Sequence, residues 1–207
     1  MEIICESLHV AMKPAIKLLK PNLADLPGYV AALQAGWSPD NVRPAETARE
    51  HLERIESDTA GFVASLDDPE AAGGPIPLPD GSFIARLPSV IRWISDGEFC
   101  GSIGFRWQNG TSALPSIVPG HIGYSIVPWK RNRGYARAAL AALLPYAKQR
   151  GLPYVELTTD PDNLASQRVI EACNGVLVEH FRKDLVFGGA EALRFRVPLD
   201  GIDAGGE

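Results

Sequence analysis

The sequence has 207 residues, of which 22% are charged and 45% hydrophobic; this composition fits one globular domain and excludes global disorder. The net charge of −5 disfavours nucleic-acid and membrane-surface binding, which usually need a basic balance. Cys5, Cys100 and Cys173 stand far apart with no C-x-x-C pair, and the histidines are equally scattered. We therefore expect no metal site, no disulfide framework, no nucleic-acid or membrane partner, and a cytoplasmic location.

The first 87 residues predict a short strand followed by a helical layer. The strand is expected around Ile16 to Leu19, and apolar residues recur at helical period over 21–34 and 44–57, with a further helical turn near 62–66. Residues 67–80 carry four prolines and two glycines, which is typical of a surface loop. This loop divides the helical layer from the rest of the chain.

From residue 88 the pattern changes to strands. Strands and helices alternate, and the last two strands are expected to form a hairpin around Gly188-Gly189. This order predicts an α/β (α+β) fold with a mixed, mostly antiparallel sheet and helices on its faces. The expected strands are 90–94, 99–107, 121–127, 154–159, 176–186 and 193–197, and the expected helices are 133–150 and 163–173.

A basic turn lies between the strand at 121–127 and the helix that follows it. Its four basic residues occupy eight positions without an acid: Lys130, Arg131, Arg133 and Arg137. A helix start offers unpaired N–H groups and a positive dipole, and Gly134 lets a ligand approach the backbone, which suits a pyrophosphate. The alternative is a solvated basic turn that only caps a helix. Rossmann and Walker patterns are absent.

This turn resembles a known family motif. Arg131-x-x-Gly134-x-Ala136, directly after Val127-Pro128, is similar to the acyl-CoA pyrophosphate loop of the GNAT N-acetyltransferase superfamily, whose pattern is Arg/Gln-x-x-Gly-x-Gly/Ala. Further on, 162–171 resembles the family's second motif, and 174–176 stands where such chains usually have Gly-Phe. The resemblance covers about 88–198 and implies a splayed central strand pair, 121–127 and 154–159, with the cofactor in the gap. It implies one acyltransferase domain over 1–207: an N-terminal layer (1–87), a cofactor-binding core (88–198) and a tail (199–207).

The resemblance also implies a cofactor and the residues that bind it. Acetyl-CoA would be the co-substrate, without a metal. Main chain at Ile126 and Val127 would pair with the pantetheine arm and polarise the acetyl carbonyl, Asn163 would contact the pantetheine, and Ser166 would lie near the thiol. Ser166 has an alternative role, bonding to amides in the first turn of its helix. The pyrophosphate would be held by backbone amides of Arg131, Asn132, Arg133, Gly134, Tyr135 and Ala136.

The catalytic groups are the least determined part of the resemblance. Many family members have a tyrosine, which protonates the leaving thiolate, at the position of Ile170; Tyr124 and Tyr135 are candidate substitutes, and the thiolate could also leave unprotonated. His121 is a candidate general base because its ordinary pKa of about 6.5 suits the task, with Glu98 second. Alternatively, His121 is a strand-end residue bonded to a neighbouring carbonyl.

Two further predictions concern residues beside the expected site. Asp160 is expected to cap the 163–173 helix. Trp37 and Trp107 stand beside loops, where either could line an acceptor pocket.

These observations predict an N-acetyltransferase that transfers an acetyl group from acetyl-CoA to a primary amine by direct attack in a ternary complex. Cys100 and Cys173 would be dispensable. The acceptor would be a small-molecule or peptide amine that the sequence does not identify, and the terminal hairpin and exposed edges are compatible with a homodimer. The alternative is a non-catalytic acyl-CoA-binding sensor or interaction module.

Overall fold

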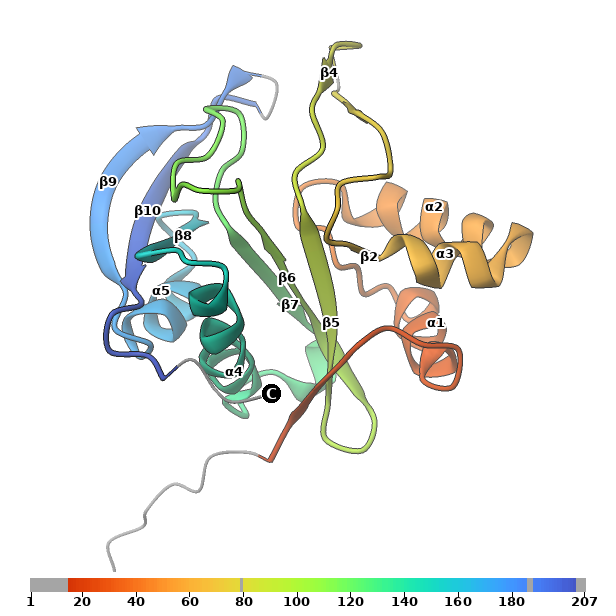
Figure 1. Ribbon diagram of the computed structural model, residues 1–207. Coiled ribbons are helices and arrows are strands. Elements are labelled where there is room, and N and C mark those ends of the chain that lie inside the picture. Colours follow the sequence, from red (N-terminus) through yellow and green to blue (C-terminus); the bar gives the residue numbers. More distant parts are fainter. Residues whose placement is uncertain (1–14, 79, 186–187, 204–207) are drawn as a thin grey trace, which may run out of the picture.

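The computed structural model describes residues 15–78, 80–185 and 188–203. Cys5, His9 and residue 186 of the expected 176–186 strand lie outside these residues, and residues 183–185, which are described, are not part of that strand. Two sheets form the centre of the fold, with α1 to α3 beside one sheet and α4 and α5 between the two (Figure 1). Among the described residues, no helix combines the length and the apolar character that a membrane crossing needs.

The N-terminal layer contains β1 (Lys17–Leu19), α1 (Leu26–Gln34), α2 (Pro44–Ser57) and α3 (Thr59–Ser65). Helix α1 begins later than the predicted residue 21, because Asn22 and Asp25 form a local turn in which the Asp25 N–H donates to Asn22 Oδ1 over 3.0 Å. Helix α2 has the predicted bounds, and α3 extends the predicted turn. Tyr29 and Phe62 pack with Trp93 of the sheet and fix this layer on one sheet face.

The segment predicted as a loop over 67–80 contains two short strands, so that prediction was wrong in part. Strand β2 (Asp67–Asp68) pairs with β5 (Ser89–Ser95), and β3 (Ile76–Pro77) pairs with β4 (Phe83–Ile84). Asp67 is held by Arg92 at 2.8 Å and by Lys20 at 3.3 Å. These ion pairs favour strand pairing where composition alone favours a loop.

The first sheet has the strand order β1-β5-β6-β7, where β6 is Phe99–Arg106 and β7 is Ile122–Ile126. Neighbouring strands run antiparallel, and side chains alternate between the two faces. Ile103 and Tyr124, which are cross-strand partners, belong to the core under α4, while Trp93 belongs to the core under α1. The sheet thus separates two apolar clusters.

The second sheet has the order β8-β10-β9, with β8 at Tyr154–Thr159, β10 at Glu191–Pro198 and β9 at Val176–Arg182. Helices α4 (Tyr135–Gln149) and α5 (Leu164–Glu171) cover the apolar face of β8 and β10, while β9 is largely exposed. Leu140 of α4 and Ile170 of α5 pack in one buried cluster with the sheet residues Leu157 and Phe195. The mixed, mostly antiparallel architecture confirms the predicted fold class.

Candidate active site

Strands β7 and β8 belong to different sheets and meet at one point. The His121 N–H donates to the Glu156 carbonyl over 2.7 Å, and the Glu156 N–H donates to His121 Nδ1 over 2.9 Å. A Cβ at Gly120 would lie 2.9 Å from the Glu156 carbonyl oxygen, so this close approach requires glycine. Beyond this contact each strand pairs with its own sheet, and the two strands splay apart.

The edge of β7 that faces the gap carries main-chain groups suited to bind a ligand. The Arg106 N–H donates to the His121 carbonyl and the Val127 N–H to the Cys100 carbonyl, so hydrogen-bonded pairs with β6 fall at odd positions of β7. The main-chain groups of Tyr124 and Ile126 therefore point away from β6. Val127 is different, because its N–H is bonded to Cys100 and its carbonyl accepts from the Lys130 N–H.

The basic turn after β7 forms a concave backbone surface. A short 3-10 helix, η1 (Pro128–Lys130), is followed by left-handed residues at Asn132 (φ 60°) and Gly134 (φ 77°). Gly134 precedes α4 and offers no side chain to cap it, so the first amides of α4 have no intrahelical partner. The side chains of Arg131, Arg133 and Arg137 are exposed here. Exposed amides, a positive helix dipole and arginines fit a pyrophosphate.

Lys130 departs from the other basic residues of this turn. Its side chain is only 7% exposed and its Nζ pairs with Asp96 at 2.7 Å and with Glu98 at 2.9 Å. Lys130 therefore does not add to the surface charge of the turn. Glu98 lies in the β5–β6 turn and pairs with Lys130, whereas His121 contacts β8 and Tyr124 contacts α5.

The start of α5 faces β7 across the gap. Asn163 caps the helix, because its Oδ1 accepts from the Ser166 N–H over 3.1 Å. The predicted cap at Asp160 is wrong, since that carboxylate pairs with Lys183 instead. Ser166 Oγ lies 2.9 Å from the Tyr124 hydroxyl, so the gap is bridged at this point by a hydrogen bond between β7 and α5. Burial raises the pKa of Tyr124 to about 12, so the phenol keeps its proton at neutral pH.

The histidine that the sequence suggests as a base is fully buried. Because the Glu156 N–H occupies Nδ1, the neutral ring of His121 carries its proton on Nε2. Burial lowers the pKa of His121 to about 4, so the ring stays neutral at physiological pH. Neither nitrogen then offers a free lone pair, which argues against His121 as a base and favours its alternative role in joining the strands.

Three further aromatic residues are committed to internal contacts. The Tyr135 hydroxyl donates to Asp96 Oδ2 over 2.6 Å. Trp37 Nε1 donates to Ser125 Oγ over 2.9 Å, and Trp107 Nε1 donates to Asn109 Oδ1 over 3.0 Å. Both tryptophans are buried, which favours a role in internal packing over the acceptor pocket that the sequence also suggested.

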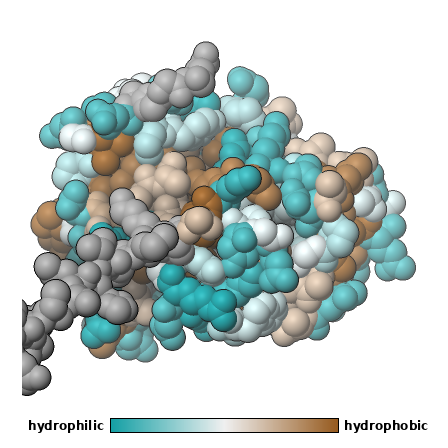
Figure 2. All heavy atoms as spheres, turned by 90° about the horizontal axis from the view of Figure 1, so that it is seen from below, coloured by the Kyte–Doolittle hydropathy of each residue, from teal (hydrophilic) through white to brown (hydrophobic). Residues whose placement is uncertain are grey.

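The face that carries the basic turn and the β5–β6 turn is seen in Figure 2. Hydrophilic side chains gather over its centre, with hydrophobic patches on either side.

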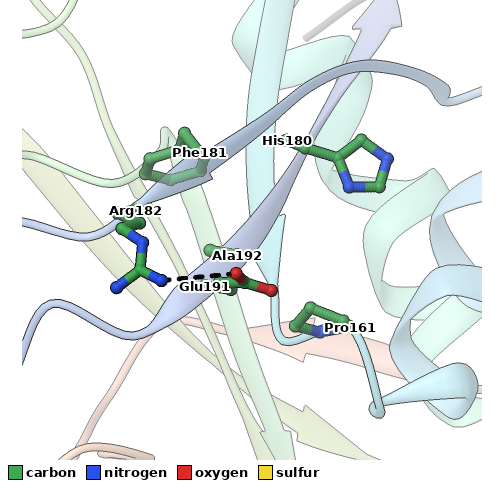
Figure 3. A pocket seen from close by; sticks show the side chains of 6 residues that line it. All are labelled: Pro161, His180, Phe181, Arg182, Glu191 and Ala192. Carbon is green, nitrogen blue, oxygen red and sulfur yellow. Dashed lines mark ion pairs between the residues drawn. The ribbon is translucent and has the colours of Figure 1, made fainter.

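A separate cleft of about 370 Å³ lies beside the loop that leads into α5 (Figure 3). It is flanked by the Arg182–Glu191 ion pair and contains none of the predicted site residues. Of the predicted cofactor residues, Ile126 belongs to β7, Asn163 and Ser166 lie at the start of α5, and residues 131–136 form the turn and the start of α4.

Comparison with known proteins identifies the family of this chain. The family model described as an acetyltransferase (GNAT) domain matches residues 16–176. A search of curated proteins gave no significant match.

Solved structures share the fold at low sequence identity. The microcin C7 self-immunity acetyltransferase MccE, in complex with acetyl-CoA and AMP, is 14% identical with a TM-score of 0.57, covering 88% of this chain and 92% of that one. RimL, a ribosomal L7/L12 α-N-protein acetyltransferase in complex with coenzyme A, is 15% identical with a TM-score of 0.55, covering 92% and 96%. The ribosomal-protein-S5-alanine acetyltransferase from Vibrio fischeri is 17% identical with a TM-score of 0.53, covering 90% and 93%.

The family model covers both the N-terminal layer and the basic turn before α4. The fold, the splayed strand pair and the concave turn are consistent with that match. The chain belongs to the GNAT N-acetyltransferase family.

Proposed function

We propose that this protein transfers an acetyl group from acetyl-CoA to a primary amine in a ternary complex, without a covalent enzyme intermediate. One observation carries the proposal: the free edge of β7 leads directly into an uncapped helix start with exposed arginines. The edge suits an extended amide-containing arm and the helix start suits a pyrophosphate. The solved relatives MccE and RimL contain acetyl-CoA and coenzyme A, which carry the same two groups.

Binding uses main chain more than side chains. The amides from residue 131 to 136, at the start of α4, hold the pyrophosphate, and Arg131 and Arg133 add charge. Ile126 offers its N–H toward the gap, while its carbonyl accepts from Arg131 Nε over 3.2 Å. Val127 makes no main-chain bond to the coenzyme, since its N–H and its carbonyl are bonded to Cys100 and Lys130, and it serves to connect Ile126 to the basic turn. Asn163 and Ser166 contact the pantetheine from the start of α5.

The reaction is a direct acyl transfer. Acetyl-CoA supplies an activated acyl group as a thioester. The amine nitrogen bonds to the acyl carbon, the carbon–sulfur bond breaks, and the Tyr124 hydroxyl, held by Ser166, gives a proton to the departing thiolate and regains one from water. Alignment of the two reactants supplies about 7–11 kcal/mol, and an N–H such as that of Ile126 directed at the carbonyl oxygen adds about 3 kcal/mol.

The amine proton leaves to water in this proposal. His121 has no free lone pair and Glu98 is paired with Lys130, so neither accepts it. Cys100 is buried, which raises the pKa of its thiol to about 11, and Cys173 is also buried. Neither thiol serves as a nucleophile, so both can be replaced without loss of the reaction.

The N-terminal layer and the core act as one catalytic unit. The Ser125 hydroxyl of β7 accepts from Trp37 Nε1 and donates to the Ser38 carbonyl over 2.9 Å. This buried bond pair fixes the segment after α1 against the strand that faces the cofactor gap. We therefore propose that the N-terminal layer, and not residues 88–198 alone, helps to form the binding site for the amine acceptor.

The test is thiol release from acetyl-CoA with a panel of primary amines, including small amines and short peptides with free N-termini. Turnover that depends on one amine class supports the proposal and names that class. Tight acetyl-CoA binding without amine-dependent thiol release across the panel would favour the acyl-CoA-binding module instead. A Cys100→Ala, Cys173→Ala double variant should keep the activity, and its complete loss would contradict direct transfer.

A further inference from the structure

A carboxylate outside the predicted site bridges the two ends of the basic turn. Asp96 lies between β5 and β6, on the hairpin turn that reaches the same end of the molecule as η1 (Figure 1). Its Oδ1 accepts from Lys130 Nζ at 2.7 Å, and its Oδ2 accepts from the Tyr135 hydroxyl at 2.6 Å. Lys130 is the last residue of η1 and Tyr135 is the first residue of α4.

The lysine side of this contact is shielded from solvent, whereas the bond between Asp96 and Tyr135 is exposed. The Lys130 side chain is 7% exposed and that of Asp96 is 21% exposed. Burial alone would raise the pKa of Asp96, but the hydrogen bonds from Lys130 and Tyr135 outweigh it and hold the pKa well below its usual range. Glu98, the second partner of Lys130, is 81% exposed and therefore holds the lysine less firmly.

The position of the two contacts bears on cofactor binding. The exposed residues from Arg131 to Gly134 are the segment that lies between Lys130 and Tyr135. We propose that Asp96 is a positioning residue: by binding both ends of this segment, it fixes the backbone amides in the arrangement that receives the pyrophosphate of coenzyme A. This inference rests on the proposed function and adds a group that acts on the cofactor only through the loop.

A preformed anion site binds more tightly than one that must be ordered by its ligand, because the ordering entropy is lost before binding. The segment includes left-handed residues at Asn132 and Gly134, which a free chain would seldom adopt together. Anchoring at both ends limits the other conformations that the segment can reach. Loss of either anchor should therefore weaken coenzyme A binding without removing any group that touches the coenzyme.

The experiment titrates coenzyme A into the full chain by calorimetry and compares matched variants. Asp96→Asn removes the charge while keeping the shape and should raise the Kd about tenfold. Tyr135→Phe removes one hydroxyl and should raise the Kd about threefold, and the double variant should be less than additive because both changes act on one contact. Asp80→Asn is the control, since Asp80 accepts hydrogen bonds from Ser82 within its own turn.

A second readout separates positioning from general stability. With an amine from the panel, Asp96→Asn should raise the KM for acetyl-CoA and leave kcat at saturating acetyl-CoA nearly unchanged. A lowered Tm with unchanged Kd and KM in both variants overturns the inference. If Asp96→Asn does not fold, an unchanged Kd in Tyr135→Phe overturns it equally. If the unaltered protein does not bind coenzyme A, the proposed function itself fails, and that result is distinct from both outcomes.

Discussion

The main chain at the start of β7 is bonded to the second sheet, whereas the main chain toward its end is open to a ligand. At its start, His121 and Glu156 exchange two hydrogen bonds and close the two sheets together. At its end, Tyr124 and Ile126 direct their main-chain groups away from β6, and the chain turns into an uncapped helix. The closed end of the gap beside β7 thus fixes how the two sheets are placed, and the open end leaves main-chain groups available to a ligand. The predictions below act on one end at a time.

The largest effect is expected at the open end, from Gly134→Val. A β-branched residue is strained at φ 77° and its side chain would occupy the space in front of the first α4 amides. We expect the Kd for coenzyme A to rise about a hundredfold or more. Gly151→Val is the matched control, because Gly151 has the same φ at the other end of α4. Equal affinities in the two variants would contradict an anion site at residues 131–136.

A smaller effect is expected for Tyr124→Phe, which removes the proton donor while leaving the ring. The variant should lower kcat about tenfold and leave the Kd for coenzyme A nearly unchanged, since general acids contribute to the chemical step. Tyr146→Phe is the control, as its hydroxyl accepts from Arg150 at the C-terminal end of α4. An unchanged kcat in Tyr124→Phe would remove this hydroxyl from the mechanism.

At the closed end, Gly120→Ala should separate the strands. Its Cβ would lie 2.9 Å from the Glu156 carbonyl oxygen, so backbone must shift to admit it. We expect the free energy of unfolding to fall by about 1–3 kcal/mol. Gly123→Ala is the comparison, because no atom lies within 4 Å of its added Cβ. Chemical denaturation measures both, and equal stabilities would show that the contact at 120–156 is loose.

The smallest effect concerns the acid sensitivity of the closed end. The pKa of His121 is about 4 in the folded protein because of burial, below its ordinary value of about 6.5. Between about pH 6.5 and pH 4 His121 is protonated in the unfolded chain but neutral in the native state. The free energy of unfolding therefore falls as the pH falls through this range. The slope is about 1.4 kcal/mol per pH unit.

His121→Asn keeps an acceptor for the Glu156 N–H but removes this proton. Denaturation at about pH 7.5 and about pH 5 should show a larger loss of stability in the unaltered protein than in the variant. The same variant should leave the pH dependence of the reaction unchanged, because His121 is not the base. Loss of the acidic limb of the pH–rate profile in the variant would restore His121 as the general base.

Much of the fold was predictable, because local patterns carry it. The bounds of α2 and β8 follow from periodicity and from flanking proline and glycine, and the turn at 131–136 follows from its spacing of arginine and glycine. The helix and strand order after residue 88 also agrees, with bounds within two residues, except that the strand predicted over 176–186 ends at Arg182. These features depend on neighbours in the sequence.

The errors come from contacts distant in the sequence. The Lys130 side chain points toward Asp96, which lies 34 positions away in the sequence. The residues next to Lys130 therefore could not show that its charge is paired internally and is not part of the basic surface. Asp160 pairs with Lys183 and leaves the cap to Asn163. The only sequence signal for the role of Asp96 is an acid in a hairpin turn, which is also the ordinary residue for such a turn.

The central claim is that the backbone from residue 131 to the first turn of α4 holds the phosphates of coenzyme A. A crystal structure of the complex with coenzyme A tests it most directly. We expect pyrophosphate oxygens within about 2.7–3.2 Å of amide nitrogens between Asn132 and Arg137, with the pantetheine arm beside Ile126. Phosphates bound at another place, or a pantetheine arm outside the gap between β7 and α5, would contradict the claim.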